Sequence, residues 1–224
     1  MMHVAIVMDG NRRWARQRGL EVCEGHAAGE RALHRIVDAA PALGVTTLSV
    51  FGFSTENWAR GEREVGALMQ LFARCANSQL LRSTRAGIRV RICGDLTQFP
   101  ASVRLALRRL ESATAANRRF TLVLALNYGG RSEILRAVRS LARSGTLHDR
   151  LTEEEFRKHL YLPDLPDPEI VIRTGGEQRL SNFLLFQLAY AEFVSSPVLW
   201  PDFAPADLAA AIANVQSRER RFGA

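Results

Sequence analysis

His3-Val-Ala-Ile-Val-Met-Asp-Gly-Asn-Arg-Arg-Trp14 is the stretch that decides the fold. Its first half, from His3 to Met8, is apolar, rich in β-branched residues and as long as a buried strand. The apolar run stops at Asp9-Gly-Asn11, a tripeptide that is typical of turns. A carboxylate and a glycine are therefore predicted at the carboxyl end of a strand, which is the edge where open α/β sheets bind their ligands.

The residue types at this edge suit both a divalent cation and an anion. The carboxylate of Asp9 is a hard oxygen ligand of the kind that Mg²⁺ prefers. Gly10 lets backbone N–H groups approach a phosphate, and the guanidinium groups of Arg12 and Arg13 suit phosphate oxygens. A strand, a turn and a solvated basic helix form the alternative interpretation, and this stretch alone leaves both open.

Length and composition narrow the class of protein. With 224 residues, 47% of them hydrophobic, the chain suits one large domain over residues 1–224. No apolar run has the length of a membrane helix and no secretory signal precedes the first strand, so we expect a cytoplasmic protein.

Three scattered cysteines without C-x-x-C spacing argue against a disulfide framework or a zinc site. The net charge of +7 favours an anionic partner, but the sole lysine, Lys158, follows no G-x-x-x-x-G run, which excludes a Walker A loop.

Apolar runs and amphipathic helical patterns alternate along the chain. Strands are predicted at residues 3–8, 45–53, 88–92, 120–126, 169–172 and 190–194, with helices between most of them. This alternation predicts a single α/β domain with a mainly parallel central sheet flanked by helices and right-handed crossovers.

Four of the predicted strand ends carry polar residues, namely Asp9–Arg12, Ser54–Trp58, Asn127–Gly130 and Arg173–Asn182. In a parallel sheet these ends lie along one edge, where a carboxylate and several arginines would form a site for a metal and a diphosphate. The chain has no G-x-S-x-G and no H-E-x-x-H pattern, so neither of these hydrolase signatures applies.

Six blocks of sequence, in order along nearly the whole chain, resemble those of the cis-prenyltransferases. The blocks are Met8–Ala15, Gly25-His26, Phe53–Trp58, Asn127–Arg131, Ile172–Leu185 and Arg218–Gly223. The resemblance implies a Mg²⁺-dependent transferase that condenses isopentenyl diphosphate with an allylic diphosphate, such as farnesyl or geranyl diphosphate, to form a cis double bond. It also implies a hydrophobic tunnel, a homodimer, no nucleic-acid partner and peripheral contact with a membrane during product release.

The same resemblance assigns roles to individual residues. Asp9 would hold Mg²⁺ against the diphosphate of the allylic primer, with Glu192 helping to place the metal, and Asn57 would assist proton removal. The residues expected to bind the substrates are Gly10, Asn11, Arg12, Arg13, Trp14, His26, Ser54, Trp58, Arg60, Arg173, Arg179 and Ser181. The last three would hold isopentenyl diphosphate. The terminal Arg221-Phe-Gly223 would complete the neighbouring site of a dimer.

Two departures from the family pattern bear on the product. Val22 stands where the family usually has an arginine that contacts the primer diphosphate, and Phe120 stands near the tunnel floor, where long-chain members carry a smaller aliphatic group. The faces of the helix at 64–86 and of the strand at 120–126 are the expected tunnel walls. Phe120 favours a short or medium product.

Three alternatives remain at this point. One is a short-chain Z-prenyl diphosphate synthase of specialised metabolism. Another is a non-catalytic partner subunit of the same fold, although the retained Asp9 favours catalysis. A nucleic-acid-binding protein is suggested by charge alone and lacks a recognised binding motif.

Overall fold

The computed structural model describes residues 2–218. Within them, a six-stranded sheet has the order β3-β4-β2-β1-β5-β6, and every neighbouring pair of strands is parallel. The strands are β1 (Met2–Val7), β2 (Val45–Ser54), β3 (Ile88–Cys93), β4 (Phe120–Tyr128), β5 (Ile170–Arg173) and β6 (Glu192–Ser195). The α-helices are α1 (Asn11–Gln17), α2 (Val22–Ala39), α3 (Glu62–Ala86), α4 (Ala101–Thr114), α5 (Gly130–Ser144), α6 (Glu153–Arg157) and α7 (Pro205–Gln216). The 3₁₀ helices are η1 (Ala40–Leu43), η2 (Thr55–Ala59) and η3 (Trp200–Asp202).

The sheet separates two apolar cores. Along β1, Val4 and Ile6 pack into one core, whereas Ala5 and Val7 pack into the other. Successive side chains of a strand point to opposite faces, and a parallel sheet that is covered on both faces needs an apolar residue at nearly every position. The continuous apolar run at the start of the chain is therefore the signature of this central strand.

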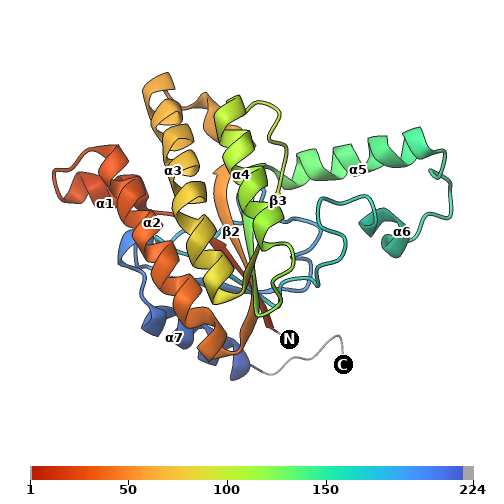
Figure 1. The fold of residues 1–224 in the computed structure, drawn as a ribbon. Coiled ribbons are helices and arrows are strands. Elements are labelled where there is room, and N and C mark those ends of the chain that lie inside the picture. The colour runs from red at the N-terminus through yellow and green to blue at the C-terminus, as the bar shows by residue number, and fades with distance from the viewer. Residues whose placement is uncertain (1, 219–224) are drawn as a thin grey trace.

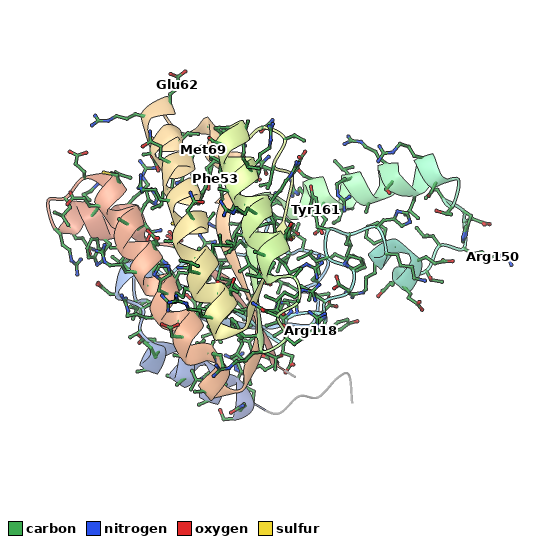
Figure 2. The ribbon with its side chains drawn as sticks, in the orientation of Figure 1. Phe53, Glu62, Met69, Arg118, Arg150 and Tyr161 are labelled. Atoms are coloured by element: carbon green, nitrogen blue, oxygen red, sulfur yellow. The ribbon has the colours of Figure 1, made fainter. Side chains whose placement is uncertain are left out.

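The larger core lies under three helices. α2, α3 and α4 lie over one face of the sheet (Figure 1), and α3 packs extensively against α4. Phe53 of β2 and Met69 of α3 are buried in the layer between this helix and the sheet (Figure 2). The predicted α/β class with a parallel central sheet flanked by helices is confirmed.

Some boundaries differ from the prediction. β4 continues through Tyr128, beyond the predicted end at residue 126, because Tyr128 still pairs with Ser54 of β2. α2 begins at Val22 rather than near Gly25, because Glu21 and Glu24 form a capping box that starts the helix earlier.

α5 and α6 extend away from the sheet as an arm, with Tyr161 near its base and Arg150 near its far end (Figures 1 and 2). In the described part of the chain, no helix combines the length and the apolar character needed to cross a membrane.

Candidate active site

A polar pocket of about 890 Å³ opens at the carboxyl edge of the sheet, next to the ends of β1, β2 and β5. The predicted residues that line it are Asp9, Gly10, Asn11, Arg12, Arg13, His26, Ser54, Asn57, Arg60, Arg173 and Ser181. The strand order brings these residues together, because β1 lies between β2 and β5 and all three strands point the same way.

Asp9 and Arg173 form the centre of the pocket. Arg173 is 95% buried at its side chain, and its Nη2 donates to Oδ2 of Asp9 at 2.8 Å. Its Nη1 donates to Oγ of Ser181 and to the backbone oxygen of Arg179, both at 2.6 Å. Arg13 lies 3.4 Å from the other carboxylate oxygen of Asp9. A planar guanidinium can make all of these bonds at once, whereas an ammonium group cannot.

Three hydrogen bonds from two residues hold the backbone of Asp9 in place. Oγ1 of Thr174 accepts from the N–H of Asp9 at 2.9 Å and donates to its carbonyl oxygen at 2.7 Å. The N–H of Trp200 donates to the same carbonyl at 3.0 Å. Thr174 is fully buried. Sequence reasoning missed this positioning residue, although it directly follows Arg173 in the block that carried the resemblance.

Two glycines make room around Asp9. Gly10 has a φ of 116°, and a Cβ there would lie about 3 Å from Leu199, so both the backbone conformation and the close approach require glycine. Gly175 has a φ of 85°, and a Cβ there would lie 2.3 Å from Nη2 of Arg13. The second glycine thus leaves the space that the Arg13 guanidinium occupies.

Glu64 at the start of α3 contacts two arginines and a histidine, which come from three different segments near the pocket. Its carboxylate lies 3.0 Å from Nη1 of Arg60, 3.4 Å from Nε2 of His26 and 3.9 Å from Nη1 of Arg12. Burial lowers the pKa of His26, and the Glu64 carboxylate opposes that shift. Glu64 was not predicted, since nothing in the local pattern of an amphipathic helix distinguishes it from the other acidic residues nearby.

The loop after β2 also contributes to the pocket lining. The side-chain oxygen of Asn57 accepts from the backbone N–H of Ser54 at 3.1 Å, which caps the short helix η2 and holds the amide at the pocket. Asn182 donates to Glu56 at 2.8 Å and so ties this loop to the segment after β5. Asn182 and Glu56 line the pocket in addition to the predicted residues.

Three of the predicted substrate residues point elsewhere. The indole N–H of Trp14 donates to Asp202 at 2.7 Å. Trp58 donates to Asn127 at 2.8 Å and packs edge-on against Phe53 rather than facing the pocket. The side chain of Arg179 is 62% exposed and pairs with Glu177, although its backbone oxygen supports Arg173.

Glu192 does not lie beside Asp9. It begins β6 and pairs in register with Ile170, at the amino end of the strands, and its carboxylate bonds Arg218 at 2.6 Å. Asp9 follows the carboxyl end of β1, so the parallel sheet separates the two carboxylates within one chain. Within a single chain, strand direction therefore keeps the two predicted metal ligands apart. The predicted role of Arg221-Phe-Gly223 lies outside the described residues.

The donor set suits a metal held largely by its substrate. Among residues 2–218, no group of three or more histidine, cysteine or acidic side chains gathers in a way that could hold a metal ion. Mg²⁺ commonly takes one or two protein carboxylates, with water and substrate phosphates as its other ligands. Asp9, whose side chain is 30% exposed in the pocket, fits that role.

An apolar cavity of about 120 Å³ continues inward from the polar pocket, between α2, α3 and the sheet. The two share the residues Met8, Asn11, His26, Gly52 and Leu68. Side chains of α3 and β4 line the cavity, as expected of the tunnel walls. Phe120 is buried two residues before the lining residue Leu122, on the same face of the strand.

A charged pocket that leads into a hydrocarbon-lined cavity suits an amphiphile with an anionic head. A family model described as "Putative undecaprenyl diphosphate synthase" matches residues 7–223. The chain belongs to the cis-prenyltransferase family.

Known relatives of this cis-prenyltransferase extend over its whole length. Isoprenyl transferase 2 of Bradyrhizobium diazoefficiens is 47% identical, over 99% of this chain and 89% of that protein. A ditrans,polycis-undecaprenyl-diphosphate synthase of Pseudomonas aeruginosa is described as (2E,6E)-farnesyl-diphosphate specific. It is 46% identical, over 99% of this chain and 90% of that protein. The crystal structure of lavandulyl diphosphate synthase from Lavandula x intermedia, in complex with dimethylallyl diphosphate, is similar with a TM-score of 0.95. It is 37% identical, covering 99% of this chain and 98% of that one. The present protein is thus an isoprenyl transferase, which confirms the predicted reaction class.

Proposed function

We propose that this cis-prenyltransferase condenses isopentenyl diphosphate with an allylic diphosphate, in the presence of Mg²⁺, to give a Z-polyprenyl diphosphate. The observation that carries the proposal is the continuity of the arginine-lined pocket with the apolar cavity. Farnesyl diphosphate is the first primer to test, since the Pseudomonas relative is described as specific for it. Dimethylallyl diphosphate is the second, since it occupies the lavandulyl synthase.

The predicted diphosphate-binding residues divide between the two diphosphates by their position. His26 lines both the pocket and the cavity, and Arg12 lies near it through their shared neighbour Glu64; Arg13 contacts Asp9. The head group of the primer would sit among His26, Arg12 and Arg13, with its chain inside the cavity. Arg173 and Ser181 lie on the other side of Asp9 and would hold the diphosphate of isopentenyl diphosphate. Holding both substrates in one pocket converts their encounter into an intramolecular step.

Asp9 would hold Mg²⁺, which supplies positive charge to the diphosphate that leaves when the allylic carbon–oxygen bond breaks. The guanidinium groups add hydrogen bonds to the same developing charge from fixed positions, and such preorganised donors need no rearrangement during the reaction. The allylic carbon bonds to the double bond of isopentenyl diphosphate, which then loses a proton. Asn57, held at the pocket by the Ser54 N–H, is the proposed assistant in that proton removal.

The proposal includes a cytoplasmic homodimer that meets a membrane when its product leaves. The projecting helix α5 exposes Leu135 and Val138, which an adjacent copy could cover. The exposed free thiol of Cys23 is compatible with a reducing compartment. Sedimentation of the wild type and of Leu135→Glu would test the assembly, and a wild-type monomer at micromolar concentration would refute it.

The central experiment supplies the purified protein with Mg²⁺, labelled isopentenyl diphosphate and, separately, dimethylallyl, geranyl, farnesyl and geranylgeranyl diphosphates. We expect extension of at least one primer, and its loss in Asp9→Ala. Asp202→Ala is the matched control, because Asp202 bonds Trp14 and Arg18 outside the pocket. Failure of all four primers would refute the proposed reaction, and activity retained in Asp9→Ala would refute the role of that carboxylate.

A further inference from the structure

The wall of the apolar cavity is interrupted at one level by polar side chains. Glu30 and His34 of α2 and Cys75 and Gln79 of α3 line it there, opposite aliphatic side chains of the sheet. These residues lie away from the polar pocket, whose lining does not include them. None of them has a role in the reaction described above.

Three of these side chains form a linked group, which we call the polar cluster: Glu30, His34 and Gln79. The amide of Gln79 donates to Nε2 of His34 and so joins α3 to α2. Oε1 of Glu30 lies 3.9 Å from the same nitrogen. Burial lowers the pKa of His34, which keeps the ring neutral as an acceptor. Among residues 2–218, Glu30 has no arginine or lysine within ion-pair distance, and the thiol of Cys75 donates a weak hydrogen bond to its carboxylate.

A growing prenyl chain meets this cluster early. His26 marks the cavity entrance, and His34 lies eight residues further along α2, which corresponds to about 12 Å of helix. An extended isoprene unit has four carbon–carbon bonds of about 1.5 Å and spans roughly 5 Å. Two or three units would therefore reach the cluster. The cavity of about 120 Å³ is also small, since one of roughly 150 Å³ holds a single benzene molecule.

Hydrocarbon that moves past the cluster must remove water from a carboxylate that has no cationic partner, and it must separate the contact between the two helices. Removing water from a polar or charged group without replacing its hydrogen bonds is unfavourable. A chain that stops at the cluster avoids both effects.

We propose that the polar cluster of Glu30, His34 and Gln79 determines product length, by ending elongation when the prenyl chain reaches it. This inference rests on the proposed condensation reaction. It is separate from the argument on Phe120, which concerns the far end of the cavity rather than its side wall. It assigns a short product to this chain. Because two or three isoprene units already reach the cluster, the main species should lie at or within one condensation of a farnesyl primer.

The test compares product ladders from farnesyl diphosphate, labelled isopentenyl diphosphate and Mg²⁺. We expect Glu30→Ala, and the double variant His34→Leu with Gln79→Leu, to lengthen the main product by at least two isoprene units. Asp38→Asn is the matched control. It weakens the contact of Asp38 with Arg82, which also joins α2 to α3, but neither residue lines the cavity. Its ladder should remain that of the wild type.

The outcomes separate the two proposals. No wild-type product from any primer would refute the condensation itself. A wild-type ladder that is unchanged in both cluster variants would overturn the inference and leave the condensation intact. An equal lengthening in Asp38→Asn would also overturn it, because the limit would then lie in helix separation alone. A binding measurement without turnover serves variants that fold but react slowly. The quantity measured is the ratio of the Kd for farnesyl diphosphate to the Kd for geranylgeranyl diphosphate. This ratio should be at least fivefold higher in Glu30→Ala than in the wild type. An unchanged ratio counts against the proposal.

Discussion

Replacing Arg173 by lysine keeps one positive charge but removes the two-nitrogen guanidinium fork, whose hydrogen bonds hold the centre of the pocket together. The side chain is 95% buried, with one nitrogen bonded to Asp9 and the other to Ser181 and the Arg179 carbonyl. A lysine ammonium has three N–H donors, but they sit on one nitrogen, so it cannot reach both positions that the two guanidinium nitrogens occupy. At least one hydrogen bond to a charged group is lost, which is worth about 1.5–3 kcal/mol. Because the site is buried, solvent screening reduces this figure little.

We therefore expect the free energy of unfolding of Arg173→Lys to fall by about 2 kcal/mol. With a urea dependence of about 2 kcal/mol per molar, the midpoint of urea unfolding falls by about 1 M. Circular dichroism in urea measures this change, and steady-state kinetics should show a raised KM for isopentenyl diphosphate. The control is Arg179→Lys, because Arg179 is mostly exposed and its ion pair with Glu177 contributes at most about 1 kcal/mol. If Arg173→Lys unfolds at the same urea concentration as this control, the reasoning on the guanidinium fork is wrong.

Three further predictions concern the frame around the site. Gly25→Ala should abolish or severely reduce stable folding in thermal melts, because its Cβ would lie 2.3 Å from a backbone oxygen of α1. Gly66→Ala has open space and should raise the free energy of unfolding by about 0.5–1 kcal/mol; two variants that melt alike would contradict this. Burial lowers the pKa of His3 below the 6.5 of the unfolded chain, so the unfolded state binds more protons in acid. The contribution of His3 to the free energy of unfolding is then largest above pH 6.5. As the pH drops below 6.5, the free energy of unfolding decreases by at most about 1.4 kcal/mol per pH unit. His3→Gln should make this decrease smaller in urea titrations at pH 5–7. Thr174→Val removes the hydroxyl that holds the Asp9 backbone; it should lower kcat at least tenfold, and Thr174→Ser should restore most of it, whereas equal kcat in both variants would refute the positioning role.

The central strand and its ligand-binding edge could be predicted because each is a property of a short stretch. His3–Met8 is apolar at nearly every position, as required of a strand that is covered on both faces, and Asp9-Gly10 ends it. In a parallel sheet, the residue after such a strand lies at the same edge as the residues after its neighbours. This is why Arg173 and Ser54 were predicted to lie near Asp9 before the strand order was known.

The residues that were misplaced or missed depend on contacts between distant segments. Glu192 has the residue type of a metal ligand, but the direction of β6 places it at the opposite edge of the sheet. Glu64 was missed because the arginines and the histidine that contact it come from α1, α2 and the loop after β2, and no local sequence pattern contains such a convergence.

The sequence by itself determined the α/β class, the edge that binds ligands and most of the residues that line the pocket. The class and the edge follow from strand periodicity and from turn chemistry, both of which act within about ten residues of the chain. The individual pocket residues followed from the resemblance of the sequence blocks to the cis-prenyltransferases. Only the tertiary structure decided that Thr174 holds the backbone of Asp9 and that Glu30 faces the apolar cavity beside Gln79. The physical reason is that hydrogen bonds and cavity walls depend on how helices and strands dock, and docking joins residues that lie as far as 188 positions apart in the chain.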